Sequence, residues 1–551
     1  MNATSAPETK HRTPSRAAGP RSGFVWIDFV FAALAMGTFT CWIYRFRYQG
    51  LLGESDLYLV LNGLLDGART STYLASLHHY GKAFSFGYIM ALYQFVDHQT
   101  LIDRLRMIAL INEIGFWSSI AGFVAFWRLT WSLYGLRSAT VAVTLFSLSP
   151  MMLELGTSGH QILPAFALFA AGSLCLLSTV KGAPRLPLAL LGFFLLLLAL
   201  VTRAEIVLGF PFLALARADL RSLPRFLKSA AVRSIVPAIA FATFLLVKHF
   251  YVEKTHGTNS LSSFLGHDLI VTRIPVGGLS ILVGCGIATT IVGLLAAVLA
   301  VRRAVAAPPR SQVRIGLGQT AIGPLSLIIP PLIFWIAIPL PVRHFILLLA
   351  GMSWLVAWLL STGLRSRPLA IYGLVAAIVF ANQALGALTA PFILRHIPNK
   401  FIALPGDQHL LPFGLPVGSA WSYHRTYEGE LLRTDRFAEQ IRNSCEPNLL
   451  VLTNREQQIL SILYHPDAAW DFKEGRIGKF PTWETPVGGR RVIVLSELGA
   501  WPEDAVAAAL ADPAVRDFKI ELDPRAILAL PHAAIPPDRV ANLSCTRAGA
   551  G

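Results

Sequence analysis

The run FVWIDFVFAALAMGTFTCWI at residues 24–43 is twenty predominantly apolar residues long. A helix of about 20 such residues spans the hydrocarbon core of a bilayer. The run is too long for the apolar core of a secretory signal peptide, and it lacks a small-residue cleavage site. We therefore expect an uncleaved first membrane span, preceded by a short polar and basic tail.

The composition of the whole chain points the same way. Of its 551 residues, 54% are hydrophobic and 14% are charged, and the mean hydropathy is +0.55, which excludes a water-soluble globule. Apolar runs of about 20 residues recur up to about residue 391, separated by short basic connectors. The formal net charge of +15 falls mostly in those connectors, so membrane topology explains it better than a nucleic-acid partner does.

The basic residues fix a predicted orientation, because they cluster in alternate connectors. By the positive-inside rule these connectors and the N-terminus are cytoplasmic. The clusters are Lys10, Arg12, Arg16 and Arg21; Arg128 and Arg137; Lys181 and Arg185; Arg217, Arg221, Arg225, Lys228 and Arg233; Arg302, Arg303, Arg310 and Arg314; and Arg365 and Arg367. About eleven spans follow, at 24–45, 107–127, 138–153, 162–180, 186–202, 204–217, 234–251, 276–300, 321–339, 342–361 and 369–390. Segment 83–97 is predicted to be interfacial or re-entrant, since a crossing there would invert every later span.

Three parts of the chain are expected. Residues 1–21 form a disordered cytoplasmic tail, residues 22–391 a transmembrane domain with a first outer loop at 46–106, and residues 392–551 an extracytoplasmic domain. In the last part, predicted helices at 434–445, 455–464 and 502–513 alternate with predicted strands at 448–453, 490–498 and 517–522, which indicates a small α/β domain. Cys445 and Cys545 lie there; an oxidising compartment would let them pair, and two free thiols are equally compatible.

The stretch GESDLYLVLNGLLDG at residues 53–67 opens the first outer loop. As a helix it would carry Glu54, Tyr58, Asn62 and Asp66 on one side and leucines on the other, which is typical of an amphipathic helix on the membrane surface. Carboxylates near lipid are costly unless they are solvated, paired or used. One explanation is an interfacial anchor with solvated acids, and the other is a functional site.

Further polar residues on the same predicted face favour a site. They are His78, His79, Tyr80 and Lys82; Glu154 and His160; Arg203 and Glu205, expected at the outer surface; and Arg343 and His344. Lys and Arg can hold the phosphate of a lipid-linked sugar and stabilise it as a leaving group. A carboxylate can deprotonate an acceptor hydroxyl or amine that attacks the anomeric carbon.

The order of these features resembles the GT-C superfamily of multispanning glycosyltransferases, which includes the protein O-mannosyltransferases and the lipid A aminoarabinose transferases. The segment from Glu54 to Tyr58 and the following Leu64-Leu-Asp-Gly67 match the acidic motif and helix of the first outer loop. Gly81-Lys82 corresponds to a G-K-P-P segment without its prolines. Leu148-Ser149-Pro150, Thr202-Arg203-Ala204-Glu205 and Pro341-Val342-Arg343-His344 match three later motifs.

The resemblance implies a fold and a set of roles. The fold is a polytopic α-helical membrane protein with about eleven transmembrane helices, interfacial helices in the first outer loop and the small C-terminal α/β domain. Glu54 takes the place of the catalytic base, usually Asp, and Asp56 is the alternative. The donor phosphate would be held by Lys82, Arg203, Arg343 and His344, and the acceptor or sugar would contact Tyr58, His79, Glu154 and His160. No metal site or other cofactor is expected, although Glu54 and Asp56 are spaced as in a metal-binding D-x-D pair.

The expected partners are a polyprenyl-phosphate sugar, membrane lipid and an envelope glycolipid, polysaccharide or protein. The expected location is the cytoplasmic (inner) membrane, as a multi-pass protein. The leading hypothesis is a glycosyltransferase with its C-terminal domain in the periplasm. A transporter or flippase of lipid-linked saccharides is the alternative, and it would predict internal repeats and ionisable groups at mid-membrane depth. A non-catalytic scaffold and an enzyme resembling the O-antigen ligases, which use a diphosphate donor, are further possibilities. The sequence leaves the sugar, the acceptor and the oligomeric state open.

Overall fold

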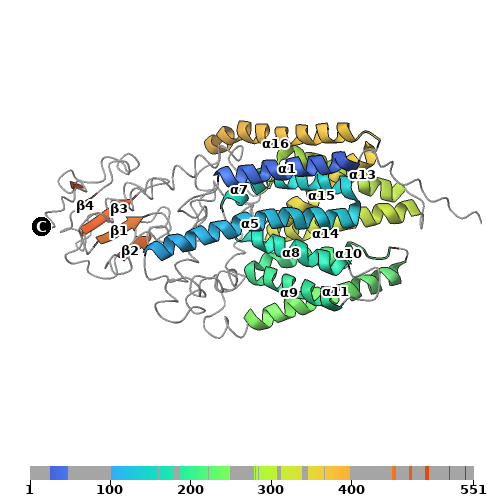
Figure 1. The fold of residues 1–551 in the computed structure, drawn as a ribbon, viewed down its shortest axis with the longest axis horizontal. Coiled ribbons are helices and arrows are strands. Elements are labelled where there is room, and N and C mark those ends of the chain that lie inside the picture. Colours follow the sequence, from blue (N-terminus) through green and yellow to red (C-terminus); the bar gives the residue numbers. More distant parts are fainter. Residues whose placement is uncertain are drawn as a thin grey trace, which may run out of the picture.

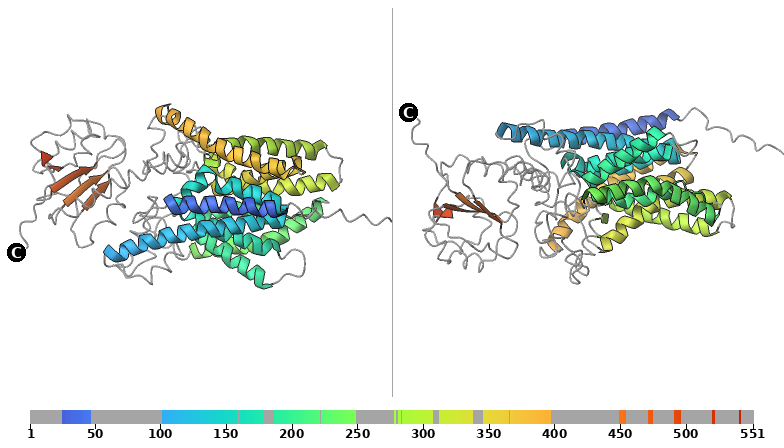
Figure 2. Two further views of the ribbon diagram at one scale, coloured as in Figure 1. Left: turned by 45° about the horizontal axis from the view of Figure 1, so that its top comes forward. Right: turned by 90° about the horizontal axis from the view of Figure 1, so that it is seen from below.

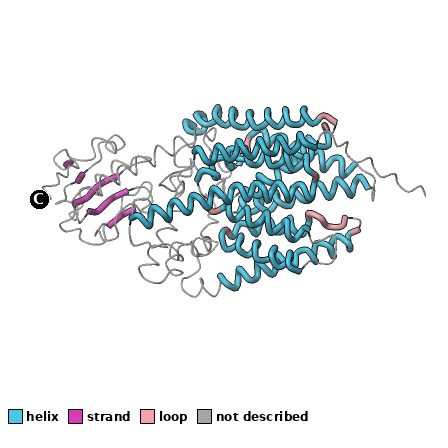
Figure 3. Tube along the Cα trace, viewed as in Figure 1, coloured by secondary structure: helices cyan, strands magenta, loops and turns pink. Residues whose placement is uncertain are grey.

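A computed structural model describes residues 25–46, 101–158, 160–178, 186–220, 222–248, 278, 281–282, 284–306, 312–337, 345–364 and 366–396, together with five strands between 449 and 541. Helices make up the first part and the strands belong to the second (Figure 3). The helices lie side by side along one common axis in all three ribbon views (Figures 1 and 2).

The helices are α1 (Val25–Phe46), α5 (Leu101–Tyr134), α6 (Leu136–Ser147), α7 (Pro150–Ser158), α8 (Ile162–Ser178), α9 (Leu186–Thr202), the 3-10 helix η3 (Ala204–Gly209), α10 (Phe210–Leu215), α11 (Leu223–Lys248), α13 (Ile287–Ala306), α14 (Gln312–Ala337), α15 (Ile346–Gly363) and α16 (Pro368–His396). Within the described residues, each of the eleven predicted spans coincides with at least one of them.

By length and composition, the described residues contain five helices able to cross a membrane, or six if the bent pair α6–α7 is one span. Shorter apolar helices are Ile162–Leu177, Leu186–Thr202, Ala204–Leu215 and Ala321–Phe334. The chain is thus a multi-pass membrane protein, and eleven crossings remain a prediction.

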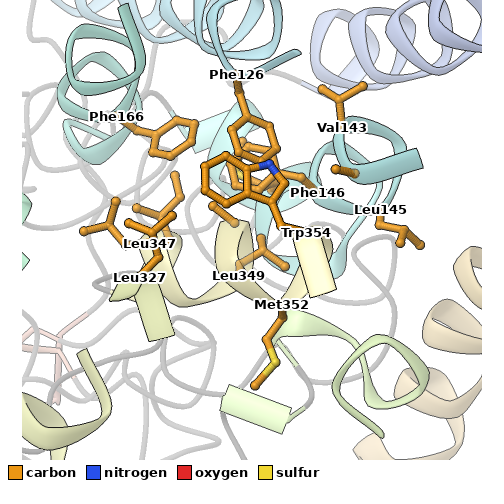
Figure 4. Packing of buried hydrophobic residues seen from close by; sticks show 14 of the residues in the cluster. Phe126, Val143, Leu145, Phe146, Phe166, Leu327, Leu347, Leu349, Met352 and Trp354 are labelled. Atoms are coloured by element: carbon orange, nitrogen blue, oxygen red, sulfur yellow. The ribbon is translucent and has the colours of Figure 1, made fainter. Parts of the chain in front are cut away.

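The apolar side chains are distributed as a bilayer requires. Most of α15 is buried at the centre of the bundle, where Trp354 stacks on Phe126 with ring centroids 5.3 Å apart, beside Phe146 (Figure 4). Trp354 Nε1 donates to Thr130 Oγ1 at 2.6 Å, so the buried indole N–H is satisfied. On the outside, α9, α11 and α13 expose many leucine, isoleucine and valine side chains, which suits contact with lipid, and the exposed Arg225, Lys228, Arg302 and Arg303 lie near the ends of α11 and α13.

The predicted span 138–153 is wrong as a single straight helix. It is divided into α6 and α7, bent by 65° at Leu148 and Ser149. The Met152 N–H donates to Ser149 Oγ at 3.2 Å, and Pro150 begins α7, so Leu148-Ser149-Pro150 is a helix stop followed by a new N-cap.

Two helix ends also differ from prediction. α5 begins at Leu101 and continues to Tyr134, past the predicted end at 127, with the exposed Arg128 lying over the Trp131 ring at 4.7 Å. α16 runs through Pro391 to His396, beyond the predicted span end at 390. In Figure 1, α5 projects past the ends of α8 and α9.

The bundle has two ends that matter for the site. We call the end formed by the last turns of α1 and α9, the first turns of α8 and α15, and α7 the site end. The opposite end, where α5, α8 and α15 finish and α6, α9, α11 and α16 begin, is the basic end, because it carries Arg137, Arg217, Arg225 and Lys228.

The short segment η3–α10 connects the two ends. It begins directly after Arg203, at the end of α9. Fourteen residues after Arg203, Arg217 donates to the carbonyls of Leu177 (2.9 Å) and Ser132 (2.7 Å), near the ends of α8 and α5. These bonds satisfy carbonyls that have no partner within their own helices. The predicted segment 204–217 therefore runs the length of α8.

The C-terminal part contains a five-stranded sheet with the order β2-β1-β3-β4-β5, parallel throughout. The strands are β1 (Leu449–Thr453), β2 (Asp471–Glu474), β3 (Arg491–Leu495), β4 (Ile520–Glu521) and β5 (Val540–Ala541). The three predicted strands are confirmed as β1, β3 and β4; β2 and β5 were not predicted. The predicted helices of this part, and Cys445 and Cys545, lie outside the described residues.

Candidate functional site

The crossing of α8 and α9 brings two predicted site residues to one end of the bundle. At the crossing, a Cβ on Gly172 would lie 3.2 Å from the Gly192 carbonyl oxygen, so the two backbones are in close contact. The helices run antiparallel. Ile162 lies ten residues before Gly172 in α8, and Thr202 lies ten residues after Gly192 in α9. Both therefore lie at the same end of the bundle, about 15 Å along each helix axis from the contact. His160 and Arg203 follow directly beyond them.

Arg203 is buried and paired. Its backbone is extended between α9 and η3, and its side chain is 4% exposed. The guanidinium makes a bidentate interaction with Glu205, from Nε to Oε2 at 3.2 Å and from Nη2 to Oε1 at 2.5 Å. Glu205 lies in the first turn of η3, where a carboxylate is favoured by the helix dipole. Arg203 is thus buried within the protein, whereas its position at the outer membrane surface stays a prediction.

His160 is fully buried just before α8. Its Nδ1 accepts the Ile162 N–H at 3.0 Å, which satisfies one of the donors at the start of the helix. An accepting Nδ1 places the proton of the neutral ring on Nε2. The ring therefore has a fixed orientation and tautomer, set by α8.

Gln161, the next residue, was not among the predicted site residues. Its side chain is fully buried, and among the described residues neither Oε1 nor Nε2 has a hydrogen-bond partner. Its backbone carbonyl accepts the Ala165 N–H at 3.3 Å, so the residue is held at the start of α8. A neutral amide beside a histidine has no sequence pattern that would single it out; only tertiary burial does.

α7 carries Glu154, whose side chain lies outside the described part. The helix packs against the last turns of α1: a Cβ on Gly156 would lie 2.4 Å from Ile43 Cγ2 and 3.5 Å from Phe39. Because α1 ends at Phe46, only seven residues separate the site end from Glu54 in the sequence.

The start of α15 lies at the same end. A Cβ on Gly209, at the end of η3, would meet the Phe169 ring at 2.5 Å and Leu347 at 3.3 Å. Leu347 follows His344 by three residues and is buried with its neighbours. The segment after Arg343 and His344 therefore enters the bundle beside η3.

Seven predicted site residues lie outside the described residues: Glu54, Asp56, Tyr58, His79, Lys82, Arg343 and His344. The structure brings His160 and Arg203 to the same end and adds Glu205 and Gln161 there. Among the residues it describes, no group of three or more His, Cys, Asp or Glu side chains could hold a metal ion. Since both predicted acids are outside this set, the expectation of no metal remains a prediction.

A second buried polar cluster lies at the basic end. Asp28 of α1 accepts from Arg137 Nε at 3.3 Å and from the Tyr372 hydroxyl at 2.5 Å, and its backbone carbonyl accepts from Thr140 at 3.1 Å. It joins α1, α6 and α16. A cavity of about 260 Å³ near the same end is lined by residues including Thr130, Tyr134 and Trp354. Neither feature adjoins the site end.

No protein-family model matches the chain, and no curated protein matches it significantly. Solved structures of ArnT from Cupriavidus metallidurans are similar to it. The ArnT structure bound to undecaprenyl phosphate is 13% identical, with a TM-score of 0.40 over 80% of this chain and 85% of that one. The apo structure is 14% identical, with a TM-score of 0.41 over 80% of this chain and 84% of that one.

The chain is similar to ArnT. At this level of identity and superposition the likeness assigns no activity to the chain.

Proposed function

We propose that this protein transfers a sugar from a polyprenyl phosphate to an envelope acceptor at the outer face of the cytoplasmic membrane. The acceptor is a glycolipid, a polysaccharide or a protein. The proposal combines the ordered motifs of the sequence with the geometry at the site end, and assigns the chain to the GT-C type of glycosyltransferase.

The observation that carries the proposal is the bidentate pair formed by the buried Arg203 and the half-buried Glu205. A buried guanidinium is costly unless it is paired, and a carboxylate bound to Nε and Nη2 fixes the plane of the group. An oriented arginine suits a phosphate, because its N–H groups match the spacing of two phosphate oxygens. Glu205 is thus a positioning residue, and Arg203 a residue that binds the donor phosphate.

The proposed reaction is a displacement at the anomeric carbon. Glu54 or Asp56 accepts the proton of the acceptor hydroxyl or amine, whose lone pair forms the new bond to that carbon. The bond between the anomeric carbon and the phosphate oxygen breaks, and its electron pair leaves with the polyprenyl phosphate. Lys82, Arg203, Arg343 and His344 stabilise the charge that develops on the leaving oxygen. A single displacement of this kind inverts the anomeric configuration.

The test compares lipid-linked and envelope glycans in cells with and without the protein. Loss of the protein is expected to accumulate one polyprenyl-phosphate sugar and remove that sugar from one envelope fraction. An unchanged profile in every fraction would contradict the proposal.

Variants then test the roles. Glu54→Gln and Asp56→Asn identify the base, since the variant that lacks it should reproduce the deletion profile at normal protein level. Arg203→Lys keeps the charge but not the bidentate geometry, so we expect slower transfer. Arg225→Ala, an exposed residue at the basic end, is the matched control and should leave the profile unchanged.

A further inference from the structure

Gln161 has hydrogen-bonding capacity that the folded chain leaves unused. A primary amide offers two N–H donors and an oxygen with two lone pairs. In Gln161 this group is fully buried, and within the part of the chain that the structure describes both its oxygen and its nitrogen lack partners. Burying an amide in this way costs free energy that an apolar side chain of similar size would not cost.

The fold satisfies an amide where the amide has a structural task. Asn382 of α16 is also buried, and its Oδ1 accepts the Thr289 N–H at 3.1 Å while its Nδ2 donates to Thr289 Oγ1 at 2.8 Å. That pair joins α16 to the first turn of α13. Gln161 makes no comparable contact, so a structural role does not account for it.

The position of Gln161 indicates where a partner would come from. It follows His160, whose ring is fixed by the Ile162 N–H, and it lies at the site end, where α9 ends in Arg203. Gln161 is a buried polar side chain without a partner among the described residues, and it lies at the end of the bundle that holds Arg203. Such a side chain is suited to a polar molecule that enters the site.

We propose that Gln161 binds hydroxyl groups of the transferred or receiving sugar and so selects for a carbohydrate. This inference rests on the proposed function. Neighbouring sugar hydroxyls both donate and accept, which matches the two kinds of atom in an amide. A phosphate only accepts hydrogen bonds, so the Gln161 oxygen would face it without a donor. We therefore assign phosphate binding to Arg203 instead.

The first experiment measures stability and needs no substrate. Gln161→Met replaces the amide with an apolar side chain of similar length, and Asn382→Leu does the same for the satisfied amide. In purified full-length protein we expect Gln161→Met to keep or raise the unfolding midpoint and Asn382→Leu to lower it. If Gln161→Met lowers the midpoint as much as Asn382→Leu, the amide has a structural partner and the proposal is overturned.

The second experiment measures recognition. The probes are the polyprenyl-phosphate sugar accumulated by the deletion strain and undecaprenyl phosphate without a sugar. Gln161→Met should raise the KM for the sugar-bearing donor about tenfold, as expected for losing neutral hydrogen bonds, and leave inhibition by undecaprenyl phosphate unchanged. Arg203→Ala should weaken both. Equal weakening of both probes by Gln161→Met would overturn the proposal.

The substrate whose KM changes shows whether Gln161 binds the donor sugar or the acceptor sugar. A higher KM for the donor alone assigns Gln161 to the donor sugar, and a higher KM for a glycan acceptor alone assigns it to the acceptor. If neither KM changes, the proposal is overturned. If the deletion strain accumulates no lipid-linked sugar, the proposed function fails, whereas the stability comparison still decides whether Gln161 awaits an external partner.

Discussion

Two residues at the end of α9 combine burial and charge. Arg203 is buried and Glu205 is half-buried, and removing one member of such a pair costs more than removing both, because the remaining charge loses its bidentate partner. We expect Arg203→Ala and Glu205→Ala each to lower the free energy of unfolding by about 3 kcal/mol, and the double variant to lose less than the sum. Denaturant unfolding of the four proteins measures the coupling. Additive losses would show that the pair is not energetically linked.

Asp28 makes a different prediction, because its cluster lies at the basic end. Asp28→Asn keeps an acceptor for the Tyr372 hydroxyl but removes the charge facing Arg137. We expect a loss of about 2 kcal/mol of stability, the scale of a hydrogen bond to a charged group, with the donor KM unchanged. Thermal unfolding and transfer kinetics check the two parts. A raised donor KM at normal stability would show that Asp28 affects donor binding and would contradict this prediction.

At the scale of single residues, the sequence predicts charged site residues but not neutral ones. Arg203 is conspicuous because a cation lies between two apolar runs, and its position at the end of α9 is confirmed. The sequence could not show that Arg203 is buried, since that depends on how neighbouring helices cover it. Gln161 is neutral, and what distinguishes it is burial without a hydrogen-bond partner among the residues that the structure describes.

At the scale of elements, hydropathy found the helices but not their interruptions. Leu148-Ser149-Pro150 was recognised as a motif, yet the break between α6 and α7 depends on the Ser149 cap, which competes locally with a continuous helix. The strand β2 was missed because Asp471–Glu474 is polar, and its place in the sheet comes from parallel pairing with β1.

The close crossing of α8 and α9 gives a prediction at this scale. Gly172→Val would insert two methyl groups against the Gly192 carbonyl and separate the helices. Overpacking of this kind costs about 2 kcal/mol, and we expect slower transfer because both His160 and Arg203 depend on the crossing. Gly37→Ala is the matched control, since a Cβ there meets nothing within 4 Å. Unfolding and transfer assays measure both; normal transfer by Gly172→Val would show that the site does not need this contact.

At the scale of the whole molecule, the basic end predicts orientation. Arg137, Arg217 and Arg225 lie at this end, and the positive-inside rule predicts that it is cytoplasmic and that the site end faces the opposite side. We expect a phosphatase that works only in the periplasm to be active when fused after residue 551 and inactive when fused after residue 220. The reverse pattern would place the site end in the cytoplasm and exclude an outer-face donor.

The lengths of the lipid-facing helices differ. α9 has 17 residues and α11 has 26, and both expose apolar side chains along their outer faces. At 1.5 Å per residue α9 covers about 26 Å, less than the roughly 30 Å of bilayer hydrocarbon. Bilayers accommodate such a mismatch by thinning around the short helix, at a fraction of a kcal/mol per Å. We therefore expect headgroups along α9 to be drawn inward to the level of its last turn, which would bring the phosphate of a lipid in that leaflet to the depth of Arg203.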